Sequence, residues 1–164
     1  MVKRLWLLRH AKSSWDDPGL ADHDRPLAPR GRKAAKRIRR WAAANEVRPD
    51  LVLCSTALRA RATLELVSGA FGTPDVKLEG GVYHAWAEDL LERLRVVPSD
   101  VRELLVIGHN PGLENLVALL APPGPGAFPT GALAELRLAV DEWRDVRAGC
   151  GELEQLVLPR SLPG

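Results

Sequence analysis

Unbroken apolar runs mark three places where the chain is expected to form buried strands. Each run is too short for a helix and is followed directly by polar residues. The three strong runs lie at 5–8, 51–53 and 104–107. Weaker strand patterns lie at 76–78, 132–140 and 153–158. These runs predict a sheet whose central strands are buried on both faces.

Helical spacing of apolar residues separates most of these strands. The expected helices cover about 29–45, 57–70, 87–97 and 111–120. Ser55 or Thr56 is a suitable N-cap for the second helix, and Asn110 for the fourth, with Pro111 in its first turn. In the second helix, the apolar stripe consists of Leu58, Ala62, Leu66 and Ala70. Strands that alternate with helices indicate an α/β architecture, and the tail over 159–164 is expected to fray.

Length and charge narrow the class of protein. The chain has 164 residues, enough to bury a core, and we expect one domain over 1–164. Its net charge of +2 does not indicate a nucleic-acid or membrane partner. Cys54 and Cys150 match neither a disulfide framework nor a zinc pattern. No signal-peptide or membrane-spanning pattern is present, so we expect a cytoplasmic protein.

Polar residues follow the end of each strong strand. In open α/β sheets, ligands bind beyond the carboxyl ends of the strands. Guanidinium groups match phosphate oxygens, and helix N-termini add backbone donors. We find no magnesium-type carboxylate cluster, zinc spacing or Walker loop, so we expect a phosphate site without metal or cofactor. The strand ends supply Arg9 with His10, Ser55 with Arg59, and His109 with Asn110.

Two further segments border this expected site. The stretch from 11 to 29 is rich in turn-forming residues and, because it follows His10, is expected to wrap around the site. The helix over 29–45 has a basic face, which is either a solvated surface or a docking face for an acidic partner or RNA. Interleaved aromatic residues that would favour RNA are missing, so we expect no nucleic-acid partner. The basic residues are Arg32, Lys33, Lys36, Arg37, Arg39 and Arg40.

Four segments together resemble the histidine phosphatase superfamily, also called the phosphoglycerate-mutase-like family. Residues 8–13 (LRHAKS) resemble its RH(G/A) signature, and 24–31 (DRPLAPRG) its D-x-P-L-x-x-x-G entry to the first helix. Residues 55–63 (STALRARAT) resemble its S-x-x-x-R-A-x-x-T segment. Residues 106–111 (VIGHNP) resemble the second-histidine segment of the SixA-type, phosphohistidine phosphatase branch. The resemblance implies a three-layer α/β sandwich, with a mostly parallel sheet and helices on both faces.

The resemblance also implies a role for each matched residue. A histidine nucleophile would attack phosphorus to give a phosphohistidine intermediate, which water would then hydrolyse. Neighbouring arginine cations disfavour protonation of the imidazole and so keep the nucleophile neutral. His10 would be the nucleophile, Arg9, Arg59 and His109 would bind and stabilise the phosphoryl group, and Lys12 and Asn110 would bind substrate.

The segment after the second helix departs from the family pattern. Many members carry a general-acid carboxylate there, often with a large cap insertion, whereas this segment is short. A weak or absent acid suits phosphohistidine, because a protonated imidazole leaves readily. Asp16 stands where many relatives have a phosphate-contacting asparagine, and we expect it to turn away or to interact with Lys12. The candidate proton donors are Glu79, Glu88, Asp89 and His84.

We therefore expect a metal-independent phosphatase acting on a phosphoramidate or phosphomonoester. Phosphohistidine on a protein is the leading substrate class, since an uncapped pocket would admit a protein loop that the basic helix helps to dock. One alternative is a phosphatase for a nucleotide or sugar phosphate. The other is a non-catalytic phosphate-binding or docking module. A mutase is disfavoured by the short acid-bearing segment.

Overall fold

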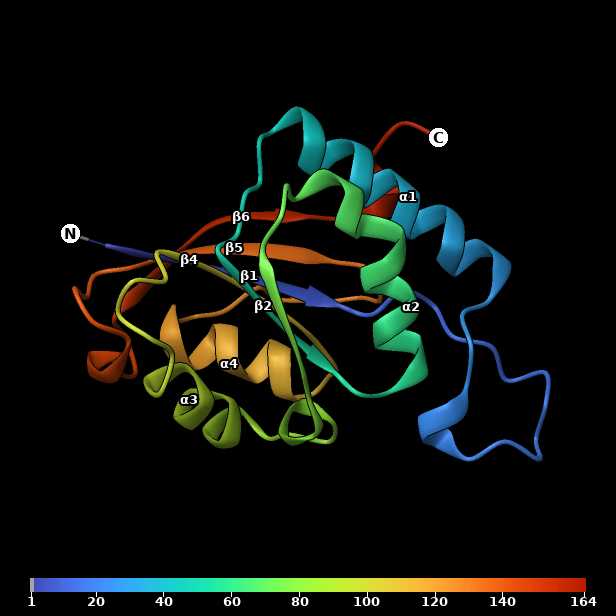
Figure 1. Cartoon of the computed structure of the whole chain (residues 1–164), viewed down its shortest axis with the longest axis horizontal. Helices are drawn as coiled ribbons and strands as arrows, with labels where there is room; N and C mark the ends of the chain where they lie inside the picture. Colours follow the sequence, from blue (N-terminus) through green and yellow to red (C-terminus); the bar gives the residue numbers. More distant parts are fainter. Residues whose placement is uncertain (1) are drawn as a thin grey trace.

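A six-stranded sheet with helices on both faces forms the molecule (Figure 1). The computed structural model describes residues 2–164. The strands are β1 (Lys3–Arg9), β2 (Leu51–Ser55), β3 (Asp75–Glu79), β4 (Glu103–Gly108), β5 (Leu133–Leu138) and β6 (Gly151–Val157). The α-helices are α1 (Pro29–Ala44), α2 (Leu58–Val67), α3 (Ala87–Arg95) and α4 (Gly112–Leu120). Short 3₁₀ turns join several of these elements.

The strand order β3-β2-β4-β1-β5-β6 brings the three strong apolar strands together. β1 pairs in parallel with β4, and β4 pairs in parallel with β2. The last two strands, β5 and β6, are antiparallel to their neighbours. The predicted α/β fold with a mostly parallel sheet is thereby confirmed. Because β1, β4 and β2 end at the same edge, the residues after them share one end of the molecule.

Burial on both faces explains why these strands are apolar without alternation. Leu5 and Leu7 of β1 lie in the core shared with α3 and α4. Trp6 and Leu8 point through the opposite face, into the core shared with α1 and α2. Successive side chains of a strand point to opposite faces, so a strand covered on both sides needs apolar residues throughout. Burying each such leucine contributes roughly 1.5–3 kcal/mol to stability.

The apolar stripe predicted for α2 is partly right, because Ala62 and Leu66 pack against the core and Ala70 is buried in the turn that follows. The most buried face of the helix, however, also carries two polar side chains, Arg59 and Thr63. Thr63 Oγ1 accepts the Ala11 N–H at 3.0 Å and donates to the Arg59 carbonyl at 2.7 Å. The helix is therefore rotated by its contacts with the segment after β1, a tertiary effect that overrides apolar spacing. Its buried residues are Arg59, Ala60, Thr63 and Val67.

Helix starts and the tail also differ from the sequence-based expectation. The N-cap of α2 is Ala57, and Ser55 Oγ instead accepts the Ala57 N–H at 3.2 Å. α4 begins at Gly112 rather than Pro111, although Asn110 Oδ1 still accepts the Glu114 N–H at 3.2 Å. The tail is not frayed over its first residues. It forms a 3₁₀ turn over Pro159–Ser161, with Pro159 buried and Leu162 packed against the α1–α2 core.

Candidate active site

His10 follows β1 directly and is only 6% exposed. Its Nδ1 lies 2.8 Å from the Ala11 carbonyl oxygen, which accepts a hydrogen bond when Nδ1 carries the ring proton. Arg59 Nε donates to His10 Nε2 at 3.4 Å, so Nε2 is the unprotonated ring nitrogen. Burial, and to a smaller extent the charges of Arg59 and Arg9, lower the pKa of His10 to about 4. The imidazole is therefore neutral near pH 7.

His109 follows β4 and faces His10 across the site. Their ring centroids are 5.1 Å apart. His109 Nε2 lies 2.7 Å from Ser55 Oγ, so the end of β2 holds the ring that β4 supplies. Burial lowers the pKa of His109 to about 3, and the nearby His10 and Arg59 act in the same direction. Both histidines are thus held neutral side by side.

The two predicted arginines border this histidine pair. Arg9, at the end of β1, donates from Nη1 to the Phe128 carbonyl at 3.1 Å. Arg59 is 6% exposed and donates from Nη1 to the Asp22 carbonyl at 2.8 Å. Within residues 2–164, the buried Arg9 Nε and His109 Nδ1 have no hydrogen-bond partner. Buried polar atoms without partners are costly and are found at functional sites more than elsewhere.

Asp22, which sequence patterns did not identify, is the anion of this cluster. Its Oδ2 accepts hydrogen bonds from Tyr83 Oη at 2.7 Å and Arg59 Nη2 at 3.1 Å, and its Oδ1 pairs with Arg25 Nη2 at 3.2 Å. The Tyr83 hydroxyl and the two guanidiniums hold the pKa of Asp22 well below its usual range. Nothing local distinguishes Asp22 from the other aspartates of the 11–29 stretch. Its partners become visible only when residue 22 meets residues 59 and 83 in space.

Tyr83 forms an aromatic wall beside the histidines. Its ring centroid lies 4.7 Å from that of His23, 3.9 Å from that of His84 and 5.5 Å from that of His109. His84 has φ +59°, a backbone conformation that non-glycine residues seldom adopt. Such local strain occurs most often at ligand sites. A cavity of about 180 Å³ opens here, lined by Asp22, Arg59, His84, Ala85, Trp86, His109, Asn110 and Pro111.

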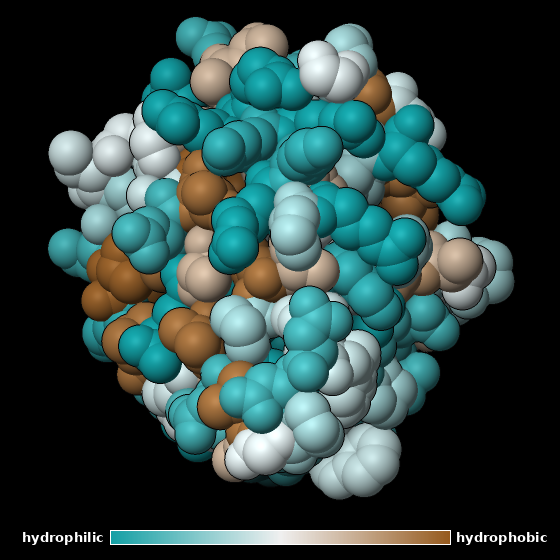
Figure 2. All heavy atoms as spheres, turned by 90° about the vertical axis from the view of Figure 1, so that its right-hand side faces the viewer, coloured by the Kyte–Doolittle hydropathy of each residue, from teal (hydrophilic) through white to brown (hydrophobic). Residues whose placement is uncertain are grey.

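The cavity opens at the end of the molecule toward which β1, β2 and β4 run. Figure 2 shows this end with hydrophilic residues over most of its upper half and a group of hydrophobic residues on its left. Two tryptophans are largely exposed. Trp15, in the stretch from 11 to 29, is 68% exposed, and Trp86, just before α3, is 61% exposed. Trp15 stacks on Arg25, whose guanidinium carbon lies 3.6 Å from the ring centroid.

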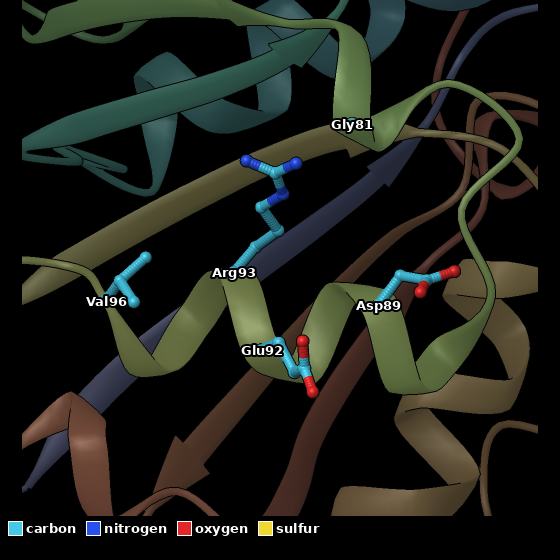
Figure 3. Close-up of a pocket in the computed structure, with 5 residues that line it drawn as sticks. All are labelled: Gly81, Asp89, Glu92, Arg93 and Val96. Atoms are coloured by element: carbon cyan, nitrogen blue, oxygen red, sulfur yellow. The ribbon is translucent and has the colours of Figure 1, made fainter.

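The carboxylates predicted as proton donors lie outside the cavity lining. Glu79 Oε2 pairs with Arg93 Nη1 at 3.2 Å at the end of β3. Asp89 Oδ2 accepts the Trp86 N–H at 2.9 Å and so stabilises the start of α3. Asp89 and Arg93 border a separate hollow of about 460 Å³ along α3 (Figure 3). Of the four candidates, only His84 lines the cavity beside His109.

Lys12 and Asp16 also differ from the simplest expectation. Lys12 is half-buried, and it lines a neighbouring hollow together with Arg30, Arg37 and Arg160 rather than the cavity beside His109. Asp16 is exposed, and its backbone N–H donates to Ser14 Oγ at 3.1 Å. It has turned away from the histidines, which is one of the two outcomes expected for it. Asn110, in contrast, lines the cavity as predicted.

Residues 2–164 show neither a membrane-spanning helix nor a metal-binding cluster. No helix in this range has the length and apolar character needed to cross a membrane. Nor does it contain a group of three or more His, Cys, Asp or Glu side chains arranged to hold a metal ion. Cys54 and Cys150 are both buried free thiols. Burial raises the pKa of Cys54 to about 12, which makes it an inert thiol near neutral pH.

Known proteins give an independent comparison for this geometry. The family model of the histidine phosphatase superfamily (branch 1) matches residues 5–81. An uncharacterised protein of Mycobacterium tuberculosis is 40% identical over 163 residues, covering 93% of this chain and 100% of that protein. Phosphohistidine phosphatase SixA of Escherichia coli is 30% identical over 145 residues, covering 82% of this chain and 85% of SixA.

A solved structure extends the match to the whole fold. The structure of the protein histidine phosphatase SixA complexed with tungstate has a TM-score of 0.82 and 25% identity, covering 96% of this chain and 98% of that one. The matched family segment contains His10 and Arg59, and the structural match extends well beyond it. The chain belongs to the histidine phosphatase superfamily and is a phosphatase.

Proposed function

We propose that this phosphatase hydrolyses phosphohistidine through a phosphoenzyme formed on His10. The observation that carries the proposal is the state of His10: neutral, buried, and with Nε2 unprotonated beside Arg59. A neutral imidazole with a fixed tautomer is ready to attack phosphorus without first losing a proton. We further propose that residues 1–164 act as one domain, because a single sheet carries both cores.

In the first step, the His10 Nε2 lone pair attacks phosphorus. The P–N bond to the substrate imidazole breaks as the Nε2–P bond forms. The leaving imidazole takes the electron pair of that bond, and a proton from solvent makes it neutral. Arg9, Arg59 and His109 are placed to donate to the phosphoryl oxygens. Phosphoryl transfer is accelerated mainly by such positioning and charge stabilisation. Water then attacks the phosphoenzyme, releasing orthophosphate and restoring neutral His10.

The incoming phosphoryl group must compete with Asp22. Both Nη atoms of Arg59 are bonded to Asp22 in the free protein, at 2.8 and 3.1 Å. A phosphoryl dianion offers the same guanidinium stronger, bidentate hydrogen bonds. We infer that substrate binding exchanges the Asp22 carboxylate for phosphoryl oxygens on Arg59. Asp22 thereby keeps Arg59 ordered and charge-compensated until substrate arrives.

The part of the cavity lining that the structure describes offers no protonated carboxyl group, which favours phosphohistidine over an ordinary phosphomonoester as substrate. Asp22 is the one carboxylate among the described residues that line the cavity, and its lowered pKa keeps it ionised. An alkoxide leaving group needs a strong general acid, whereas an imidazole leaves readily once protonated. The names of the SixA relatives, at 30% and 25% identity, point to the same substrate class.

The test compares phosphate release from a phosphohistidine peptide with release from an alkyl phosphate and from an aryl phosphate. We expect kcat/KM to be highest for the phosphohistidine peptide, by roughly 10² or more over the alkyl phosphate, since that is the size of a typical general-acid contribution. A Cys150→Ala variant, changed far from His10, provides a control for handling and folding. Preference for a nucleotide or sugar phosphate would instead assign the protein to small-molecule phosphatases. Binding of phosphate without turnover of any substrate would contradict catalysis.

A further inference from the structure

A second hollow, of about 260 Å³, lies on the α1 side of the catalytic loop. Four cationic side chains from three separate segments line it: Lys12, Arg30, Arg37 and Arg160. We propose that this basic hollow is a second anion-binding site, which takes a phosphate-bearing group of the diphosphate type with at least two negative charges. It differs from the cavity beside His109 in both its lining residues and its electrostatics.

Among the described residues, the four cations have no anionic partner. No carboxylate is among the residues that line the hollow. Within residues 2–164, none of the four side chains takes part in an ion pair or hydrogen bond. The cations at the catalytic cavity and at the hollow along α3 are paired, as Arg59 is with Asp22 and Arg93 is with Glu79. Like charges gathered in one concavity repel one another, and a bound anion would relieve this repulsion.

The hollow is built against the nucleophile's own backbone. The Ala28 N–H donates to the Lys12 carbonyl at 2.9 Å, and the Gly131 N–H donates to the carbonyls of Arg9 and His10 at 3.0 Å. A Cβ at Gly31 would collide with the Lys12 carbonyl oxygen, so the first turn of α1 is pressed onto the catalytic loop. The walls of the hollow are thus tied to the segment that positions His10. A ligand there would contact the segment that carries His10.

The chemistry of the lining indicates the ligand. Three of the four cations are arginines, whose planar guanidinium groups match phosphate oxygens in pairs. The first turn of α1, a helix of 16 residues, contains no acidic side chain, so its positive dipole end is not neutralised locally. Ala34, Leu158 and Pro159 give the hollow an apolar part. Since ligand pockets for larger molecules are about 300–1,000 Å³, this hollow suits phosphate groups with a small body attached.

The hollow along α3 differs from the basic hollow in its charges. It is larger, about 460 Å³, but its Arg93 already pairs with Glu79, and Asp89 and Glu92 add negative charge (Figure 3). Size alone therefore does not indicate an anion site. What distinguishes the basic hollow is that its cations are convergent and unpaired.

The test is a ¹H–¹⁵N NMR titration with inorganic pyrophosphate. We expect saturable shifts of the amides of Gly31, Thr130 and Ser161, which report on the basic hollow. The amides of Gly108 and Ala85 report separately on the catalytic cavity. The titration measures binding without turnover. If the amides of the catalytic cavity do not shift, the proposed function is contradicted. If the amides of the basic hollow do not shift, the second site is contradicted.

Two triple variants test whether pyrophosphate binds to the basic hollow itself or only to the general positive charge of this surface. Arg30→Ala/Arg37→Ala/Arg160→Ala removes three charges from the hollow, while Arg32→Ala/Lys33→Ala/Lys36→Ala removes three from the solvent face of the same helix. We expect the first variant to weaken pyrophosphate binding at the hollow by tenfold or more, and the second by less than twofold. Alanine favours helix, so both variants should fold, which circular dichroism would check. Equal weakening in the two variants, or no shifts at the hollow in the wild type, would overturn the proposal.

Kinetics identify the source of the anion. If the hollow binds a second group of the substrate, pyrophosphate will inhibit turnover of doubly phosphorylated substrates more strongly than turnover of an aryl monophosphate. If it binds a free effector, pyrophosphate will change aryl-phosphate turnover without competing with the substrate. Both results support the second site, and loss of either effect in the hollow variant would attribute it to these cations.

Discussion

The arginines on the two sides of His10 are held in different ways. Arg59 is buried and donates to both the backbone and the carboxylate of Asp22. Arg30 and Arg160 are exposed, and neither side chain is paired within residues 2–164. An internal anion keeps the catalytic guanidinium ordered and rigid before substrate binds. Cations without such an anion are expected to be ordered by their ligand instead.

This contrast separates the two proposed anion sites. At the proposed catalytic centre, substrate binding would exchange one anion for another, so the affinity would be lowered while the geometry is set in advance. At the basic hollow, binding adds the first counter-charge. Changes to the groups around His10 are expected to differ widely in their effects on activity and stability.

Loss of Arg59 should have the largest effect on chemistry among changes to the charged groups. We expect Arg59→Ala to lower kcat by about 10²–10³-fold, the usual cost of removing one donor that stabilises transition-state charge. Arg61→Ala is the matched control, because Arg61 lies on the same helix but donates to the Thr56 carbonyl. Steady-state kinetics on one substrate would measure both. Similar losses in the two variants would mean that α2 has been disturbed rather than a catalytic contact removed.

Acid should destabilise the fold through the buried histidines. The pKa of His10 is lowered to about 4 by burial, whereas an unfolded histidine titrates near 6.5. The unfolded state therefore binds more protons between these values, and stability falls as pH falls through this window. For His10 alone, the loss by pH 5 should be roughly 2 kcal/mol, at about 1.4 kcal/mol per unit.

Urea unfolding at pH 7 and pH 5 would measure this loss, since the free energy of unfolding extrapolates linearly with urea. His10→Gln should flatten the pH dependence, because glutamine does not titrate. An unchanged pH dependence in that variant would show that His10 is already protonated, or accessible to water, in the folded state.

Removing the internal anion should change affinity in the opposite direction to removing the cation. We expect Asp22→Asn to tighten binding of inorganic phosphate by about 3- to 10-fold, because a competing negative charge is lost. The same change should lower the melting temperature, since Arg59, Arg25 and Tyr83 lose an ionised partner. Asp24→Asn, in the same turn but outside this network, should do neither. Calorimetric titration with phosphate would measure the affinity of each variant. Weaker phosphate binding by Asp22→Asn would contradict the competition and show that Asp22 helps to bind the phosphoryl group.

Glu79 should have the smallest effect. It was a candidate general acid, but its carboxylate pairs with Arg93 at the end of β3. Since this pair is partly exposed, its loss should cost about 0–1 kcal/mol. We expect Glu79→Gln to retain kcat within about twofold of wild type at every pH tested. If the Glu79→Gln variant lost the acid or the alkaline limb of the pH–rate profile, Glu79 would be a proton donor after all.

Local signals were enough to predict the sheet and which residues gather at its end. His10 and His109 each follow an apolar run that is itself buried, so a single stretch of sequence indicates both the strand and the residue at its end. Arg59 was identified by its unfavourable place near a helix N-terminus and by its motif. The parallel sheet then brings these residues together without further information.

Contacts made through loops could not be predicted in this way. Asp22 and Tyr83 are 61 residues apart, and their hydrogen bond depends on how two irregular segments fold onto the same edge. The buried face of α2 was only partly predicted for a related reason, because Thr63 is held by the backbone of the loop after β1. Lys12 lies in the expected motif, but its side chain lines the hollow on the α1 side.

The most direct test of the account is to trap the phosphoenzyme. Brief reaction with a phosphohistidine peptide, an alkaline quench and mass spectrometry would locate the phosphoryl group, and ³¹P NMR would identify the nitrogen that carries it. The account predicts up to one phosphoryl group per chain, on Nε2 of His10, and none in His10→Ala. A phosphoryl group on His109 or His84, or full turnover by His10→Ala, would contradict it.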